Sequence, residues 1–259
     1  METRNFKERG VEPLTFGSLF AGIGGFDLGF ERAGMQCKWQ VEIDDYATRV
    51  LEKHWPSVHR ERDIRDCGKH NLEAVDVICG GFPCQDISVA NVTGKGLDGE
   101  RSGLFFEAVR VIDEVQPRIA VLENVSAILS DGMGRVLGEM AAIGYDTEWH
   151  CIPAASVGAT HIRDRVFFLA YAGRERRKGS VAIKRAPVCK KAPQPIVDDE
   201  ASGSRSLMDR NIWTVRDSEV SLGVERHRLR GLGNAVVPQV AEWIGRRIIE
   251  SEKQCPSIT

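Results

Sequence analysis

The sequence predicts an α/β fold in which helices cover both faces of a mostly parallel, doubly wound sheet. The first observation behind this prediction is that short apolar runs alternate with amphipathic stretches through about the first 170 residues. The second is that the connections between these runs are short, as is usual where strands and helices follow one another in turn. The third is length, because 259 residues suffice for one large α/β domain or for such a domain with a smaller insert.

The apolar runs give the strands, and the amphipathic stretches between them give the helices. Strands are expected at residues 14–20, 37–43, 74–80, 118–125 and 165–172. Helices are expected at residues 24–34, 44–55, 102–115 and 134–144. Gly34, Pro56 and Pro117 end the first three helices, since glycine and proline are helix terminators. One face of a last helix is marked by apolar residues spaced four apart: Val240, Ile244 and Ile248.

The alternating pattern breaks down between Ala172 and Ser221. This stretch contains three prolines, many charges and one aromatic residue, Trp213. It indicates an inserted module rather than a continuation of the sheet. We therefore expect three parts, in which a main domain is interrupted by a short insert and then resumed: residues 12–171, 172–221 and 222–251.

The composition is that of an ordinary globular protein, with 42% hydrophobic and 28% charged residues. No run approaches the roughly 18 apolar residues of a membrane span. The N-terminal stretch METRNFKERG is charged and lacks the apolar segment of a secretion signal. These features predict a cytoplasmic protein without a membrane partner. Seven cysteines without a CxxC pair fit neither a disulfide framework nor a common zinc site, so no metal is expected.

Basic residues are concentrated in part of the chain, although the net charge is −2. Ten lysines and arginines lie between Thr160 and Lys191, against only Asp164 and Glu175. Such a cluster is consistent with a solvated charged face. It is also what contact with a phosphate backbone requires.

Polar and glycine residues follow the predicted strands at the edge where doubly wound sheets bind ligands. The first strand is followed by the glycine-rich stretch FAGIGGFDLG, which begins at Phe20. The second strand ends near Glu42, an acid suited to the hydroxyls of a ribose, and Asp63 follows further along. Either acid alone fits a surface position. Together they outline a site for an adenosine-containing cofactor, although the glycines match a nicotinamide fingerprint only loosely.

A thiol and a carboxylate lie where the next two strands end. Cys84 lies in the turn GGFPCQDIS, and Glu123 begins the triplet ENV. At neutral pH a thiol with a pKa of about 8.5 needs nearby positive charge or a proton acceptor to act as a nucleophile. On its own the turn is compatible with a passive cysteine.

The ordered set FAGIGGF, EID, GGFPCQDIS, ENV, RDRVF and GNAVVPQVA resembles the DNA cytosine-5 methyltransferases. The match covers most of the chain outside residues 172–221. The resemblance implies the Rossmann-like fold of S-adenosylmethionine-dependent methyltransferases, with residues 172–221 as a small target-recognition insert. It implies a DNA (cytosine-5-)-methyltransferase that flips the target base out of double-stranded DNA.

The resemblance also assigns roles to individual residues. Cys84 would attack cytosine C6, Glu123 would contact N3 and the exocyclic amine, and Arg165 would contact O2 with Arg163 beside it. The cofactor would be S-adenosylmethionine, held by Phe20, Gly22, Gly24, Glu42, Ile43, Asp63, Ile64, Pro83, Leu104, Asn234 and Val236. DNA would be contacted by Ser88, Arg101, Arg174 and Arg176.

Two residues depart from the family pattern. Ser18 stands where many relatives have an acid, and His161 stands where glutamine is usual. The insert of about fifty residues is also close to the size at which a separate core becomes marginal. A short target site is therefore expected.

Several alternatives stay open at this point. An RNA (tRNA) cytosine-5 methyltransferase could use the same catalytic set, and an inactive nucleic-acid-binding relative would not need the thiol. A dinucleotide oxidoreductase has only the glycine turn in its favour. We expect a monomeric modification enzyme of bacterial or phage type, for which a cognate restriction endonuclease encoded elsewhere is an open partner.

Overall fold

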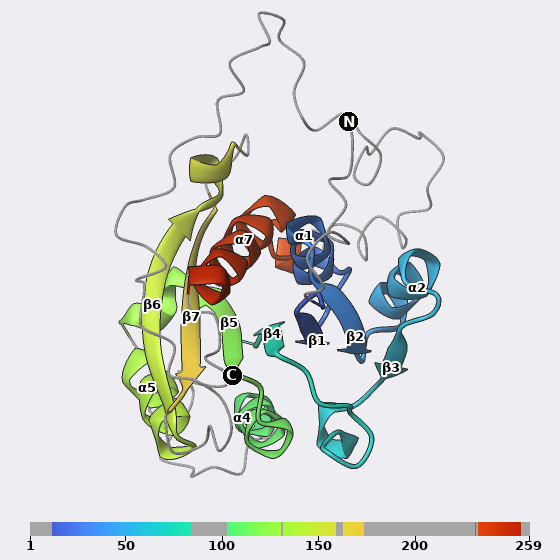
Figure 1. Cartoon of the computed structure of the whole chain (residues 1–259), viewed down its shortest axis with the longest axis horizontal. Helices are drawn as coiled ribbons and strands as arrows, with labels where there is room; N and C mark the ends of the chain where they lie inside the picture. Colours follow the sequence, from blue (N-terminus) through green and yellow to red (C-terminus); the bar gives the residue numbers. More distant parts are fainter. Residues whose placement is uncertain are drawn as a thin grey trace, which may run out of the picture.

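One seven-stranded sheet organises the molecule (Figure 1). The computed structural model describes residues 12–83, 103–130, 132–158, 163–173, 231 and 233–254. The strand order is β3-β2-β1-β4-β5-β7-β6. The strands are β1 (Thr15–Leu19), β2 (Gln36–Val41), β3 (His59–Glu61), β4 (Val77–Gly81), β5 (Ile119–Val125), β6 (Tyr145–Pro153) and β7 (Asp164–Ala172).

The sheet is mostly parallel, as the sequence predicts. Strands β1 to β5 pair in parallel, whereas β7 runs antiparallel to both β5 and β6. All five expected strands are present. The sequence predicted no strand at β3 or β6, and both of these lie at edges of the sheet.

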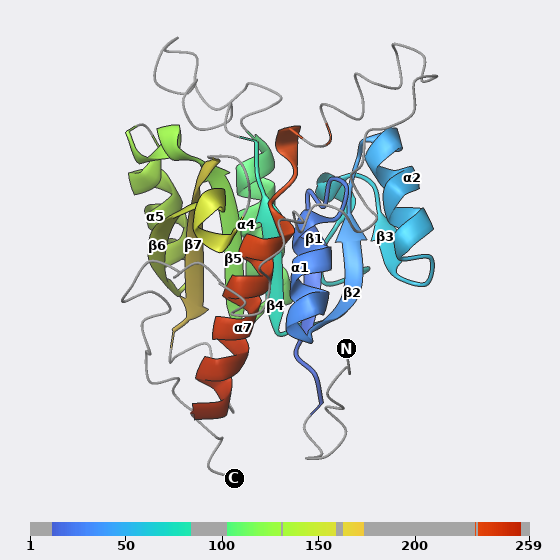
Figure 2. The ribbon, with the colours of Figure 1, turned by 90° about the horizontal axis from the view of Figure 1, so that it is seen from above.

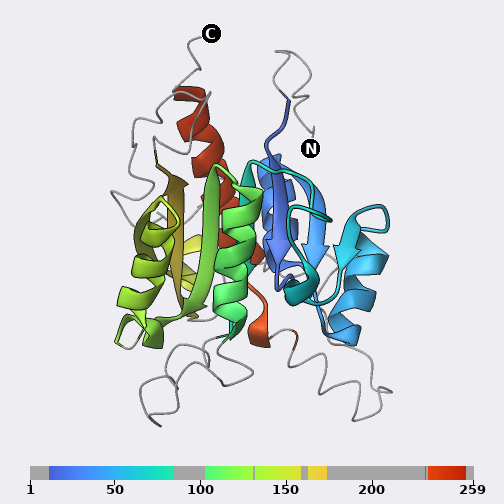
Figure 3. The same cartoon turned by 90° about the horizontal axis from the view of Figure 1, so that it is seen from below.

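Helices cover both faces (Figures 2 and 3). The helices are α1 (Gly25–Ala33), α2 (Asp45–His54), α4 (Gly103–Val115), α5 (Met133–Ala142) and α7 (Pro238–Gln254). Short 3₁₀ segments are η2 (Ile64–Asp66), η4 (Ser126–Leu129) and η5 (Ala154–Val157). Helices α1 and α7 lie side by side on one face, and α4 and α5 lie on the other.

Helix ends follow the local sequence signals. Gly34 ends α1 with a φ of 101°, a left-handed conformation that glycine adopts without steric cost. Asp44 caps the start of α2, where its side chain accepts a hydrogen bond from the Ala47 amide at 2.9 Å.

The described chain contains no helix that is both long enough and apolar enough to span a bilayer.

Two apolar layers form the core, one on each face of the sheet. The layer under α1 and α7 includes Phe16, Phe30, Phe167 and Ile244. The layer under α4 and α5 includes Trp39, Phe105, Phe168 and Met140. Each of these side chains has almost no exposed surface, and burial of this kind contributes roughly 1.5–3 kcal/mol for a large apolar side chain.

Helix α7 packs closely on α1 although the two helices are more than two hundred residues apart in the sequence. A Cβ added to Gly29 would lie 2.4 Å from the Ala241 Cβ and 2.5 Å from the Pro238 carbonyl oxygen. Glycine is therefore required at this point of α1 for the two backbones to approach. The far end of α7 is tied to the sheet by an ion pair between Arg118 and Glu252.

Candidate active site at the carboxyl edge of the sheet

The turn after β1 brings a backbone amide onto the carboxylate that follows β2. Phe20 and Gly22 have positive φ values of 50° and 56°. A bulky residue in this left-handed region is strained, and such strain is characteristic of functional turns. The Gly22 amide donates a hydrogen bond to Glu42 Oε2 at 2.7 Å. The Asp44 amide donates to Glu42 Oε1, also at 2.7 Å.

This arrangement fits the adenosine part of a cofactor. Each Glu42 oxygen accepts one amide bond and keeps a further lone pair for a ligand hydroxyl. Burial raises the Glu42 pKa. A Cβ added to Gly22 would meet only the Phe20 carbonyl oxygen, at 3.9 Å, among the described atoms. A ligand can therefore approach the backbone closely. The apolar Ile43 beside Glu42 is 62% exposed, which suits it to the face of a purine.

Three of the expected cofactor-binding side chains belong to, or pack against, the core layer beneath α4. Ile64 is buried in that layer, and Phe20 and Leu104 pack against it. Asp63 precedes Ile64 and caps η2, where its carboxylate accepts a hydrogen bond from the Arg65 amide at 3.0 Å. The turn after β1, η2 and the first turn of α4 thus all contact the same apolar layer.

Gly24 has a different surrounding from Gly22. Its φ is 86°, and an added Cβ would lie 2.5 Å from the Trp55 ring. Glycine at this position is therefore required by the packing of the turn against the end of α2. This packing holds the turn in place whether or not Gly24 also touches a ligand.

The end of β4 is shaped by two glycines and by Asn124. A Cβ on Gly80 would lie 2.6 Å from the Leu19 carbonyl oxygen, and one on Gly81 would lie 2.9 Å from Glu123 Oε2. The buried Asn124 side chain donates to the Phe82 carbonyl oxygen at 3.0 Å. Asn124 therefore fixes the chain just before Pro83, which is exposed. We did not predict this role. The signal was present in the middle residue of ENV.

Glu123 forms a buried ion pair with Arg165. Arg165 Nε lies 2.8 Å from Glu123 Oε1, and Glu123 is only 6% exposed. Burial raises the Glu123 pKa to about 7, although the positive charges of Arg165 and Arg163 act in the opposite direction. At neutral pH the carboxyl group is therefore protonated in a substantial fraction of molecules.

Arg163 adds a second cation to this cluster. Burial lowers the pKa of its guanidinium, and the positive charge of Arg165 lowers it further. Within the part of the chain that the structure describes, its Nε and Nη2 atoms are buried without a hydrogen-bond acceptor. A buried guanidinium in this state provides donors for an acceptor atom of a ligand.

The start of α7 returns to the same edge. A Cβ on Gly25 would lie 2.3 Å from the Val236 carbonyl oxygen, and one on Gly81 would lie 4.0 Å from Val236 Cγ2. Val236 is buried between the glycine turn and the end of β4. Asn234 is exposed two residues earlier.

Several expected site residues lie outside the described residues. These are Cys84, Ser88, Arg101, Arg174 and Arg176, together with His161. Cys84 directly follows Pro83, the last described residue of the turn beside Asn124. Their roles and the three-part division of the chain stay predictions.

A buried polar cluster below the glycine turn was not predicted. The Ser18 hydroxyl donates to Asp27 Oδ2 at 3.1 Å, and Gln40 Nε2 donates to Asp27 Oδ1 at 2.8 Å. Arg60 Nη2 donates in turn to Gln40 Oε1 at 2.8 Å. Ser18, the departure from the family pattern, is thus committed to a carboxyl group on α1.

Comparisons with known proteins agree with this geometry. A family model described as C-5 cytosine-specific DNA methylase matches residues 14–204. The Type II methyltransferase M.HhaI of Haemophilus parahaemolyticus is 31% identical over 169 residues, which is 64% of this chain and 51% of the relative. The Type II methyltransferase M.FnuDI of Fusobacterium nucleatum is 30% identical over 205 residues, 78% of this chain and 55% of the relative. The chain spans about half the length of these relatives.

Solved structures show the same fold. An E. coli prophage protein described as a DNA modification methyltransferase superposes with a TM-score of 0.52 and 28% identity, over 61% of this chain and 47% of that one. The DNMT2 mutant of Spodoptera frugiperda superposes with a TM-score of 0.53 and 19% identity, over 67% of this chain and 53% of that one. The second likeness concerns the fold alone.

Proposed function

Because the chain belongs to the C-5 cytosine-specific DNA methylase family, we propose that it methylates C5 of a cytosine flipped out of double-stranded DNA. One observation carries this proposal. The buried Glu123 carboxyl, held by Arg165 with Arg163 beside it, lies at the sheet edge where the segment Pro83-Cys84 begins. A pyrimidine ring needs donors and acceptors of this kind along one edge.

Family membership implies S-adenosylmethionine as the cofactor. When bound, it supplies the methyl group that C5 accepts. Glu42 would hold the ribose hydroxyls through the lone pairs that its two amide bonds leave. Ile43 and Phe20 would cover the purine, while Asp63 and Ile64 would meet its edge.

Cys84 would begin the reaction as a nucleophile. C5 of cytosine is too weak a nucleophile to accept a methyl group unaided. Bond formation between the Cys84 sulfur and C6 moves electron density toward C5 and N3, which makes C5 reactive. Once C5 has accepted the methyl group, loss of the C5 proton and expulsion of the Cys84 thiolate would restore the aromatic ring as 5-methylcytosine.

Glu123 would stabilise the charge that develops on the ring. With a pKa of about 7, it can carry the proton that an electron-rich N3 requires. Arg165 Nε lies 2.8 Å from Glu123 Oε1, and this contact would orient the carboxyl group before the attack. Arg165 would contact O2 of the base, and the unused donors of Arg163 would meet a further acceptor.

Target recognition is proposed to lie in the short region 172–221. Phosphate contacts from its basic residues would position the enzyme, but they do not read sequence. About fifty residues can mount few base-reading side chains, so we propose a short target site. The names of the relatives support a methyltransferase of the Type II kind. A cognate endonuclease encoded elsewhere is part of the proposal.

A covalent trap tests the proposal. The full chain is incubated with S-adenosylmethionine and duplex DNA that carries 5-fluorocytosine, where the C5 fluorine cannot leave as a proton. We expect a covalent complex with the wild type and with Cys151→Ser, a matched control at an exposed thiol. We expect none with Cys84→Ser. Methylation of ordinary DNA without a trapped complex would contradict the covalent step, and transfer to tRNA but not to DNA would identify an RNA enzyme.

A further inference from the structure

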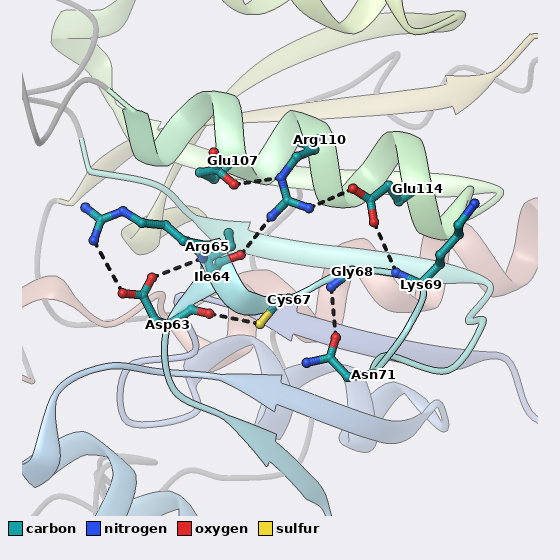
Figure 4. A network of polar contacts seen from close by, with 10 residues as sticks. All are labelled: Asp63, Ile64, Arg65, Cys67, Gly68, Lys69, Asn71, Glu107, Arg110 and Glu114. Atoms are coloured by element: carbon teal, nitrogen blue, oxygen red, sulfur yellow. Dashed lines mark hydrogen bonds and ion pairs between the residues drawn. The ribbon is translucent and has the colours of Figure 1, made fainter. Parts of the chain in front are cut away.

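A charged stripe on α4 contacts the segment that carries two of the proposed cofactor residues (Figure 4). Glu107, Arg110 and Glu114 lie three and four residues apart, so they share one face of the helix. Arg110 Nε donates to Glu107 at 2.7 Å, and Nη1 donates to Glu114 at 2.7 Å. These two carboxylates fix the plane of the guanidinium.

The third arm of this guanidinium leaves the helix. Arg110 Nη2 donates to the Ile64 carbonyl oxygen at 3.0 Å. Glu114 makes a second contact further along the same segment, where Oε2 accepts the Lys69 amide at 3.3 Å. An added Cβ on Gly68 would lie 2.2 Å from Glu114 Oε2, so the segment approaches the helix closely. Helix α4 therefore holds the segment by hydrogen bonds at Ile64 and at Lys69, which are five residues apart.

Hydrogen bonds within the segment from Asp63 to Asn71 make it move as one piece with the Ile64 carbonyl and the Lys69 amide. Cys67 Sγ donates to the Asp63 carbonyl oxygen at 3.2 Å, and the Gly68 amide donates to Asn71 Oδ1 at 2.9 Å. The Asp63 carboxylate is itself held by the Arg65 amide. The position of the Ile64 carbonyl thus sets the position of the Asp63 carboxylate.

We propose that Arg110 is a positioning residue of the cofactor site, which holds Asp63 and Ile64 where they meet the adenosine of S-adenosylmethionine. This inference rests on the proposed function. Arg110 itself does not need to touch the ligand. The same helix carries Leu104 in its first turn and begins at Gly103, so one rigid element supports the cofactor edge at two places.

The expected effect is on affinity rather than on turnover. Without the guanidinium the segment samples other positions, and the apparent dissociation constant rises in inverse proportion to the fraction of molecules that stay binding-competent. A competent fraction of about one tenth corresponds to affinity weakened about tenfold. Once the cofactor is bound, the segment is held by its ligand, so the chemical step should proceed at its usual rate.

The test measures binding of S-adenosylhomocysteine and of 5′-methylthioadenosine by calorimetry, with full steady-state kinetics. We expect Arg110→Met to weaken both ligands about tenfold, because they share the adenosine. The cofactor KM should rise by a similar factor, while kcat and the KM for DNA stay within about twofold. Arg110→Lys should recover part of the affinity. Arg246→Met is the matched control, because Arg246 on α7 makes a similar pair with Glu242 at 2.7 Å on an exposed surface.

Each outcome decides the proposal. Unchanged affinity of folded Arg110→Met would overturn it, and so would a loss of kcat and DNA affinity together with cofactor affinity, which indicates general damage. Should Arg110→Met not fold, Glu114→Ala removes the contact with the Lys69 amide together with one of the two carboxylates that hold Arg110. This variant should weaken binding about threefold, and wild-type affinity there would overturn the proposal. Wild-type protein that binds neither ligand would instead refute the proposed function, which separates the two failures.

Discussion

Asp27 has no exposed surface, and replacing it with asparagine should change how the stability of the fold depends on pH. The carboxyl group lies on α1 beneath the glycine turn. It accepts hydrogen bonds from Ser18, Cys37 and Gln40, which are all neutral. Burial raises its pKa from 3.8 to about 6 in spite of these bonds. Asparagine keeps the shape and can donate to the Ser18 oxygen, as a protonated Asp27 would.

The sign follows from proton linkage. A raised pKa means that the folded state binds the proton of Asp27 more tightly than the unfolded state. The free energy of unfolding therefore falls as the pH rises from 3.8, and the loss is complete above about 6. The full difference between the two pKa values corresponds to about 3 kcal/mol. Between pH 5 and pH 8 the wild type should lose about 1.5 kcal/mol that the variant keeps.

Urea unfolding at pH 5 and pH 8, without cofactor, measures this difference. We expect Asp27→Asn to be less sensitive to pH than the wild type by that amount, with an unchanged denaturant slope. Glu52→Gln is the control, because it also removes one carboxylate, but at a position that is exposed on α2. An equal stability difference between wild type and Asp27→Asn at both pH values would refute the reasoning.

Three further predictions concern the site and the helix seam. Glu123→Gln should lower kcat by about a hundredfold or more with little change in either KM, since the carboxyl acts mainly in the transition state; steady-state kinetics would show a purely binding role as a KM effect. Gly81→Ala should lower kcat about tenfold or more, because its Cβ would lie 2.9 Å from Glu123 Oε2 and displace that group; unchanged kcat would contradict the crowding. Gly29→Ala should cost about 1–3 kcal/mol in urea unfolding through overpacking against Ala241. Gly138→Ala is the control, because Gly138 is helical and an added Cβ would meet no described atom within 4 Å. This variant should raise the free energy of unfolding by about 0.5–1 kcal/mol. Equal effects at Gly29 and Gly138 would contradict close packing of α1 against α7.

Strong periodicity made most of the fold predictable. Buried parallel strands are continuous apolar runs, and the helices between them end at glycine or proline, so both signals are local. The edge strand β6 was not predicted from the sequence because it lacks an apolar run. Most of its residues are partly buried or exposed, and only Tyr145 and Ile152 are fully buried apolar side chains. Strand β3 was not predicted because its three residues, HRE, are all polar and give no apolar signal for a strand.

The candidate site also contains residues whose positions the sequence could predict and residues whose contacts it could not. The positions of Glu42, just after β2, and of Glu123, near the end of β5, could be predicted because topology alone brings strand ends together. The contacts of Asn124, Asp27 and Arg110 depend on which element packs on which, and no local pattern carries that information. Asp27 in particular has an unremarkable place in the sequence, on an amphipathic helix where an acid is usually exposed. Only the approach of β1 and β2 to α1 buries it.

The close packing of α1 against α7 around Gly29 and Ala241 affects both the stability of the fold and the position of residues at the candidate site. Val236 lies two residues before the start of α7, and its carbonyl oxygen occupies the space that a side chain at Gly25 would fill. The same residue reaches toward Gly81, whose missing side chain leaves room for Glu123. Looser packing of α7 on α1 would therefore move Val236 away from both the glycine turn after β1 and the Glu123 carboxyl group. For this reason the geometry of this edge of the sheet depends on how α7 packs on α1.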